Sequence, residues 1–332
     1  MSNAKQILAM LRSRVEGDEE QFYSIALQVA ASEARQGRRT TADELRAAVD
    51  EARGKNARGP SVAIPFARPR GELENLIDLK ATRLRLSDVV LQETLCKRLE
   101  DIIRQQQKRE WLREHDKTPN RRILFVGPPG SGKTMTAEAL AGELKLPLFV
   151  IRLESLITRF MGETASKLRL VFDETLKHRG VYLFDEFDAL GGRRNATNDV
   201  AEMRRVLNSF LQLMEQPNAT DSLLIGATNH PELLDRALLR RFDVILEFPT
   251  PTDKQIQTLI KKNLKPLTLS RLNWKSILAS AQGLSQSEIV RAVEDAVKTA
   301  ILDERNTLTT ADIVDRLAQR LEMREAFSRI TK

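Results

Sequence analysis

The most informative stretch of this 332-residue chain is Gly127-Pro128-Pro129-Gly130-Ser131-Gly132-Lys133-Thr134. It follows an apolar run, Ile123–Val126, and opens a segment with helical spacing that ends near Leu144. The pattern G-x-x-x-x-G-K-[ST] between a strand and a helix is typical of a phosphate-binding loop, because its glycines let backbone N–H groups converge on phosphate oxygens. The sequence predicts that Lys133 reaches the β- and γ-phosphates of a nucleotide and that the Thr134 hydroxyl binds Mg²⁺.

A pair of carboxylates follows another apolar run downstream of this loop. Asp185 and Glu186 come directly after Tyr182–Phe184. An acidic pair alone could merely cap a helix, but its position after a phosphate-binding loop favours hydrolysis over binding alone. We expect Asp185 to hold the Mg²⁺ through water, and Glu186 to polarise the attacking water as general base.

Two further polar features lie near later apolar runs. Asn229 follows Leu223–Ala227 and could either orient the attacking water or act as a turn residue. Arg240 and Arg241 precede the last apolar run, Val244–Phe248. Adjacent arginines are usually a solvated pair, but the rigid guanidinium also suits a transferring phosphoryl group. One chain cannot readily point these arginines at its own site, so we expect a neighbouring subunit to supply them.

Short apolar runs alternate with helical segments through the middle of the chain. They are Ile123–Val126, Leu148–Ile151, Val181–Phe184, Leu223–Ala227 and Val244–Phe248. Strands separated by helices predict an α/β fold with a five-stranded parallel sheet. After Pro249 and Pro251 the strands stop, and three capping patterns indicate helix starts. Those patterns are at 252–255, 285–288 and 309–312.

This pattern predicts four parts along the chain. Residues 1–53 have the apolar spacing of a small helical domain, and 54–71 form a linker rich in Pro, Gly and Arg. Residues 72–250 form the nucleotide-binding core, and 251–332 form a helical lid subdomain. About fifty residues bury little surface alone, so we expect the first part to pack on its own oligomer, the main body or a partner.

The motifs together resemble AAA+ ATPases, closest to the clade of FtsH-like and proteasomal remodelling ATPases. Within that clade the chain resembles a stand-alone bacterial type with a short helical N-terminal domain. The resemblance covers roughly residues 74–330. It implies a hexameric ring, with ATP between the core of one subunit and the arginines of the next. It also implies nucleotide contacts from Asp88, Val90 and Met135, because the segment from Asp88 resembles the stretch whose backbone contacts adenine.

The chain departs from the family pattern at two places. The usual R-P-G-R-F-D is shortened to Arg240-Arg241-Phe242-Asp243, so Arg241 matches the Arg before Phe-Asp, and the placement of Arg240 is less defined. Gln286-Ser287 stand where the clade commonly has Gly-Ala. No second sensor arginine is assigned, and Arg291 is interpreted as a surface residue.

Phe160-Met161-Gly162 lie between the second strand and its following helix. In the family, an aromatic–hydrophobic–glycine triplet at this place lines a central pore and grips an extended polypeptide. Large, adaptable apolar side chains with a glycine beside them suit that task. The alternative is a helix end that packs both side chains into the core.

Composition narrows the candidate functions. Aromatic residues make up 5% of the chain, too few for nucleic-acid binding by base stacking to be the leading candidate function. The single cysteine excludes a disulfide framework. The N-terminus has no signal-peptide apolar region and no run is long enough to span a membrane, so we expect a cytoplasmic protein.

Three functions remain open. The first is an ATP-driven ring that remodels or unfolds a protein substrate. The second is an ATP-controlled scaffold that switches a separate effector, such as a protease or nuclease, without threading it. The third is a nucleic-acid loader or motor, weakly supported by the net charge of +7 and by no dedicated DNA-binding motif.

Overall fold

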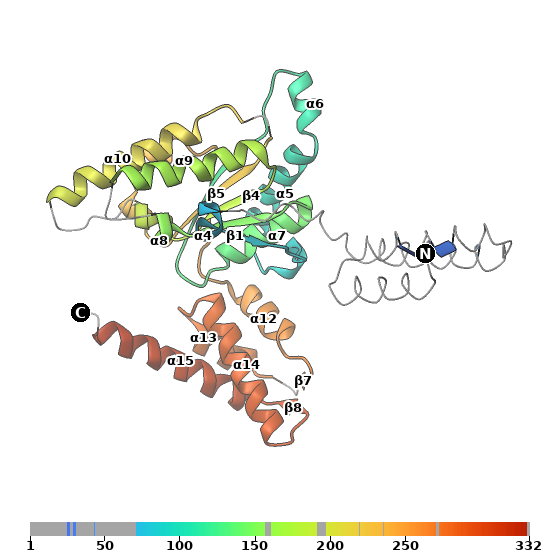
Figure 1. Cartoon of the computed structure of the whole chain (residues 1–332). Coiled ribbons are helices and arrows are strands. Elements are labelled where there is room, and N and C mark those ends of the chain that lie inside the picture. The colour runs from blue at the N-terminus through green and yellow to red at the C-terminus, as the bar shows by residue number, and fades with distance from the viewer. Residues whose placement is uncertain are drawn as a thin grey trace. The chain divides into compact units, whose positions relative to one another are not determined.

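The computed structural model (Figure 1) divides into two compact units, Met1–Pro65 and Phe66–Lys332. The residues it describes are 25–26, 29–30, 43, 71–156, 161–190, 197–218, 220–234, 236–269 and 272–330. In the first unit, the described residues are helical, and Ala26 and Ala30 are buried. The boundaries predicted at residues 53 and 71 stay predictions.

A six-stranded sheet forms the centre of the second unit. In spatial order its strands are β1 (Ile77–Lys80), β3 (Leu148–Ile151), β4 (Val181–Phe184), β5 (Leu223–Thr228), β2 (Arg122–Val126) and β6 (Val244–Glu247). The five predicted strands are present, and neighbours among them pair in parallel.

The sixth strand, β1, was not predicted, and it pairs antiparallel with β3 at the edge of the sheet. Its four residues alternate apolar and polar, and Ile77 is buried. So short an alternation is a weak signal in the sequence, because pairing with β3 is what makes it a strand.

Helices cover both faces of the sheet (Figure 1). Before β2 come α4 (Glu72–Leu76), the 3₁₀ turn η1 (Leu86–Asp88), α5 (Glu93–Gln107) and α6 (Arg109–Glu114). After it come α7 (Lys133–Leu144), α8 (Leu153–Leu156), α9 (Met161–Lys177), η2 (Phe187–Leu190), α10 (Thr197–Met214), η3 (Pro231–Leu233) and α11 (Arg236–Leu239). Lys108 ends α5 and directly precedes α6.

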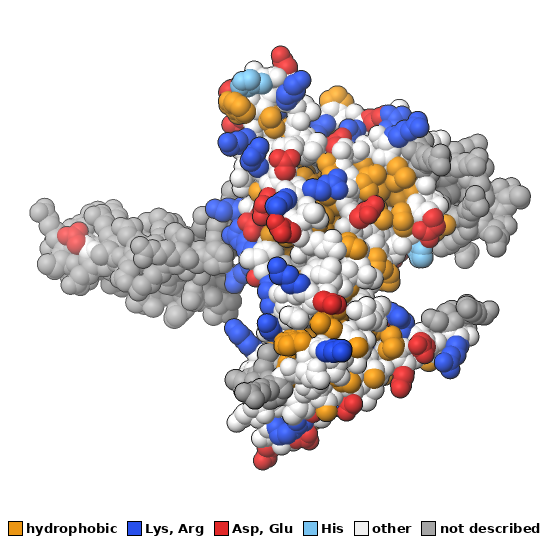
Figure 2. Space-filling model, turned by 180° about the vertical axis from the view of Figure 1, so that it is seen from behind, with side chains coloured by type: hydrophobic (Ala, Val, Ile, Leu, Met, Phe, Trp, Pro, Cys, Tyr) orange, Lys and Arg blue, Asp and Glu red, His pale blue; other side chains and the backbone are white. Residues whose placement is uncertain are grey.

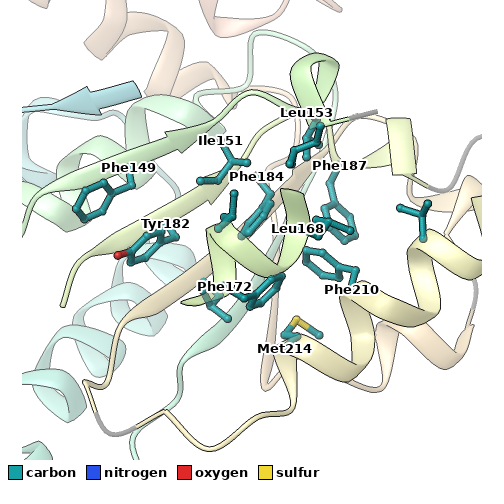
Figure 3. Close-up of a cluster of buried hydrophobic side chains, with 14 of the residues drawn as sticks. Phe149, Ile151, Leu153, Leu168, Phe172, Tyr182, Phe184, Phe187, Phe210 and Met214 are labelled. Carbon is teal, nitrogen blue, oxygen red and sulfur yellow. The ribbon is translucent and has the colours of Figure 1, made fainter. Parts of the chain in front are cut away.

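The side chains of β4 show how the two faces differ. Val181 and Leu183 pack toward α5 and α7, whereas Tyr182 and Phe184 pack toward α9 and α10, as strand alternation requires. The second face is rich in aromatic rings (Figure 3). Phe210 of α10 contacts Phe184 and Phe187 edge-on, with ring centroids 5.2 and 5.0 Å apart.

The lid subdomain follows β6. It contains α12 (Asp253–Lys262), β7 (Thr268–Leu269), α13 (Trp274–Ala281), α14 (Gln286–Leu302), β8 (Thr307–Leu308) and α15 (Thr310–Ile330). The three predicted caps are present at Thr252, Ser285 and Thr309. The expectation that strands stop after Pro251 was wrong, because β7 and β8 pair in parallel; two-residue strands have no periodicity to detect. Within the described part of the chain, no helix is both long and apolar enough to cross a membrane.

Candidate functional site

The predicted phosphate-binding loop joins the end of β2 to the start of α7. Gly130 and Gly132 have φ values of 73° and 95°, a region that other residues rarely adopt. A Cβ on Gly130 would also collide with the Ser287 hydroxyl of the lid. The Ser131 hydroxyl is buried and has no hydrogen-bond partner among the described residues, as a donor reserved for a ligand would be.

Lys133 is buried at the centre of this loop, with 6% of its surface exposed. Its Nζ donates to Gly127 O at 2.7 Å, Pro128 O at 2.9 Å and Asn229 Oδ1 at 2.8 Å. These three oxygens use all three ammonium donors. Burial lowers the pKa of Lys133, and the carboxylates of Asp185 and Asp188 oppose that shift. The structure therefore brings two predicted residues, Lys133 and Asn229, into direct contact.

The predicted Mg²⁺ ligands also meet. Thr134 Oγ1 donates to Asp185 Oδ2 at 2.7 Å, which joins the first turn of α7 to the end of β4. A hydroxyl and a carboxylate are hard oxygen ligands, and Mg²⁺ is usually held by one or two carboxylates together with phosphate oxygens. The two residues fit that ion and would hold it beside the phosphates of a bound nucleotide.

Glu186 has an unusual backbone. Its φ of 52° lies in the left-handed region, which costs a non-glycine residue about 1–3 kcal/mol. Its peptide N–H donates to Asp185 Oδ1 at 3.0 Å, and its side chain is exposed. Phe187, the next residue, is fully buried. This turn places Glu186 on the surface beside the loop while the chain returns to the core.

Asp188 is a site residue that the sequence prediction missed. Its Oδ1 accepts from Thr228 Oγ1 at 2.8 Å and from the Asn229 N–H at 3.3 Å. Thr228 is fully buried at the end of β5. Asp188 therefore fixes the segment that presents Asn229 to Lys133. The signal available in the sequence was a further carboxylate three residues after Asp185.

The three residues implied to contact the nucleotide, Asp88, Val90 and Met135, differ in exposure. Asp88 is exposed, and its carboxylate accepts from the Arg85 N–H at 2.8 Å. Val90 is buried within the apolar core of the lid, and its carbonyl accepts from Gln286 Nε2 at 3.1 Å. Met135, in the first turn of α7, is 40% exposed. Gln286 is a second residue that the predicted site did not include.

The arginine pair lies at the opposite end of the sheet from the loop. Ile123 of β2 pairs in parallel with Val244 of β6. Arg240 and Arg241 come before the amino end of β6, whereas the loop follows the carboxyl end of β2. A strand of five residues is about 15 Å long. Arg241 forms an ion pair with Glu215. The structure therefore does not bring either arginine to the chain's own loop.

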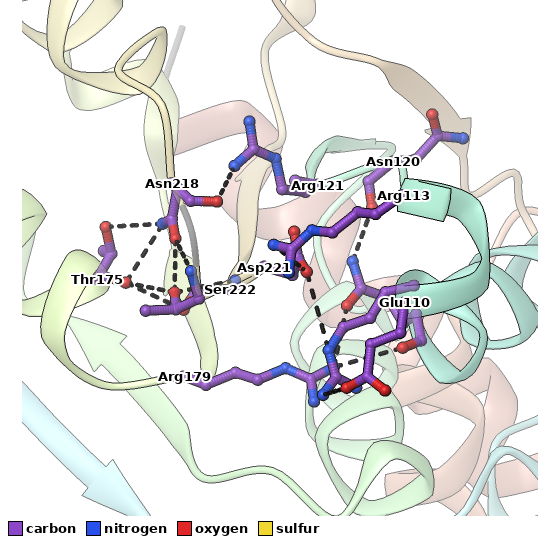
Figure 4. A network of polar contacts seen from close by, with 12 residues as sticks. Glu110, Arg113, Asn120, Arg121, Thr175, Arg179, Asn218, Asp221 and Ser222 are labelled. Carbon is purple, nitrogen blue, oxygen red and sulfur yellow. Dashed lines mark hydrogen bonds and ion pairs between the residues drawn. The ribbon is translucent and has the colours of Figure 1, made fainter. Parts of the chain in front are cut away.

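Asp243 anchors this arginine segment to β2. Its carboxylate accepts from the backbone N–H of Arg121 and of Arg122, each at 2.9 Å, and from Arg122 Nε at 3.0 Å. Burial would raise the pKa of Asp243, but the hydrogen bonds from both arginines hold it below its ordinary value. The polar network continues nearby (Figure 4), where Arg113 pairs with the buried Asp221 at 2.7 Å.

The structure describes only part of the predicted pore triplet, Phe160-Met161-Gly162. Phe160 lies outside the described residues, and only the backbone of Met161 and Gly162 is described. Met161 is the first residue of α9.

The chain is similar to known proteins over this site. Residues 123–250 match the family described as "ATPase family associated with various cellular activities (AAA)". An uncharacterized AAA family ATPase of Sinorhizobium fredii, y4kL, is 32% identical over 301 residues, which cover 89% of each chain.

Other relatives are longer proteins. ATP-dependent zinc metalloprotease FtsH 1 of Methylacidiphilum infernorum is 31% identical over 216 residues, which cover 63% of this chain and 34% of FtsH 1. A protein of Methanothermobacter thermautotrophicus, named as a homolog of a 26S proteasome regulatory subunit, is 37% identical over 151 residues, 45% of this chain and 41% of that protein. The chain thus spans less than half the length of these two relatives.

Proposed function

Since this chain belongs to the AAA family of ATPases, related to FtsH and proteasomal ATPases, we propose that it works as a homo-oligomeric ring, a hexamer by resemblance. In this proposal, hydrolysis of ATP with Mg²⁺ drives the remodelling or unfolding of a protein substrate.

The observation that supports the catalytic part is the meeting of four residues from three segments of the chain. Lys133 contacts Asn229, and Thr134 contacts Asp185, so the loop is tied to the ends of β5 and β4. Thr134 and Asp185 would hold Mg²⁺, which supplies charge neutralisation at the phosphates. Glu186 lies beside them on the surface and would take the proton of the attacking water.

The position of Arg240 and Arg241 supports a nucleotide site that two neighbouring subunits share. Proteins of this family typically assemble into oligomers. Arg240 and Arg241 lie a strand length from the chain's own loop and are better placed to serve the nucleotide of a neighbour. An arginine supplied in this way accelerates phosphoryl transfer by about 10³–10⁵. Arg241 would leave its ion pair with Glu215 when it engages that neighbour.

The remodelling role is supported by the sequence Phe160-Met161-Gly162 at the start of α9. The scaffold role is the second candidate, and the division of the chain at Pro65 favours it, because a separate compact unit can dock an effector. A nucleic-acid motor has less support. On the face in Figure 2, Lys and Arg side chains are interspersed with Asp and Glu, whereas a nucleic-acid site is usually a continuous basic stripe.

Replacing Phe160 distinguishes remodelling from scaffolding. Phe160→Ala is expected to retain basal ATP hydrolysis and to lose ATP-dependent unfolding of a model protein client. Phe160→Tyr keeps an aromatic ring and should retain unfolding. If Phe160→Ala unfolds the client as fast as the wild type, the pore role is wrong and the scaffold is favoured. If the variant fails to fold, Phe160 packs in the core.

A further inference from the structure

Gln286, the first residue of α14, joins the lid to two parts of the nucleotide site. Its carboxamide Nε2 donates to the Val90 carbonyl at 3.1 Å, and the side chain is 8% exposed. Its Oε1 lies 3.7 Å from where a Cβ on Gly132 would stand. The side chain therefore spans the distance between Val90 and the last glycine of the phosphate-binding loop.

The backbone next to Gln286 fixes this arrangement. The Ser287 N–H donates to Gly130 O at 3.0 Å. Ser285 caps α14 and exchanges hydrogen bonds with Glu288. The first turn of α14 is thus attached to the loop, and the Gln286 side chain has little freedom to leave Val90 while the lid stays in place.

The chemistry of the contact matches that of adenine. Adenine presents one exocyclic amine as donor, and a backbone can receive it only through a carbonyl oxygen. The Nε2 of Gln286 is a carboxamide NH₂ group, also planar, that donates to a carbonyl. An adenosine bound between Val90 and the loop would need the same acceptor and the same space.

We propose that the Gln286 carboxamide competes with adenine for the Val90 carbonyl, so that ATP must displace this side chain when it binds. The inference rests on the proposed adenine contact at Val90. Val90 packs within the apolar core of the lid, so displacement of Gln286 changes the contact between the lid and the core. Gln286 is then a positioning residue that links nucleotide entry to the seating of the lid.

Binding of ADP to the full chain tests this competition, because ADP avoids turnover. In isothermal titration, Gln286→Ala is expected to bind ADP about two- to tenfold more tightly than the wild type, the fold-change that corresponds to loss of one competing hydrogen bond. Gln286→Met keeps the length of the side chain without a donor, and it should also bind more tightly. Gln282→Ala, an exposed glutamine of the lid that contacts Asp253, should bind ADP like the wild type.

Thermal unfolding separates this role from a merely structural one. Both Gln286 variants should have a lower Tm without nucleotide and a larger rise in Tm with ADP than the wild type. Unchanged or weaker ADP binding in either folded variant would overturn the competition. If the wild type itself bound no adenine nucleotide, the proposed function would fail and this inference with it.

Discussion

The ring of Phe187 packs edge-on against the ring of Phe242, with centroids 5.9 Å apart. Phe187 directly follows Glu186, and Phe242 directly follows Arg241. The general base proposed for one nucleotide site and the arginine proposed for the neighbouring site are therefore connected through one aromatic contact. Both rings are buried in the core that also holds Phe210.

Phe242→Leu is expected to lower ATP turnover more than it lowers nucleotide affinity. Leucine keeps the site apolar but loses an aromatic contact of about 0.5–1.5 kcal/mol, so both flanking residues become less well fixed. Steady-state kinetics and ADP titration measure the two effects. Equal losses in turnover and affinity would mean that the contact serves only the fold.

Asp188 should affect catalysis indirectly, because it holds the segment Thr228–Asn229 in place. Asp188→Ala removes the acceptor for Thr228 and for the Asn229 N–H, and turnover should fall about 10- to 100-fold, the range that corresponds to about 1.5–3 kcal/mol for hydrogen bonds to a charged group. Asp188→Asn keeps an acceptor oxygen and should recover most of that loss. If the asparagine variant were as slow as the alanine variant, the positioning role would be wrong.

Substitutions at Lys133 and at Glu186 should have different effects on nucleotide binding and on ATP turnover. Lys133→Ala removes the charge from the centre of the loop and is expected to abolish nucleotide binding. Glu186→Gln keeps that charge, so it should bind ATP and lose turnover by about 10²–10⁴, the usual contribution of a general base. The exposed Lys177→Ala is the matched control for charge removal. Wild-type turnover in Glu186→Gln would refute the role of Glu186.

Asp312 should make the stability of the lid depend on pH. Its hydrogen bonds from Arg305, at 2.8 Å and 3.1 Å, hold its pKa at about 2 against an ordinary 3.8. A lowered folded-state pKa stabilises the fold above the ordinary value, and that stability is lost as the pH falls through the folded-state value. Asp312→Asn should therefore lower the Tm at neutral pH, and its difference from the wild type should shrink between about pH 4 and pH 2.

Asp303→Asn is the matched control for this prediction, because Asp303 contacts the same Arg305 from an exposed position. Its Tm should change little, as expected of a surface ion pair. A difference in Tm for Asp312→Asn that does not change over this pH range would show that the cap, and not the charge, provides the stability.

The phosphate-binding loop and its flanks could be predicted because their signals are local. The loop glycines, the apolar runs and the capping residues at Thr252 and Ser285 each determine their own segment. These signals were enough to place the five parallel strands.

The features that were missed depend on contacts between distant segments. Asp188 becomes a site residue only because η2 returns to the end of β5, and Gln286 only because the lid folds back onto Val90. No local pattern distinguishes these residues from surface polar groups. The strand β1 is similar, since pairing with β3 defines it.

If one catalytic site is built from residues of two subunits, mixing two inactive variants should restore activity. Arg241→Ala subunits keep Glu186, and Glu186→Gln subunits keep Arg241. In a mixed ring, some interfaces combine an intact base with an intact arginine. ATP turnover of the mixture should rise well above that of either variant alone, at the same total protein concentration. A mixture no more active than its components, together with a wild-type rate per subunit that does not change with protein concentration, would contradict the shared site.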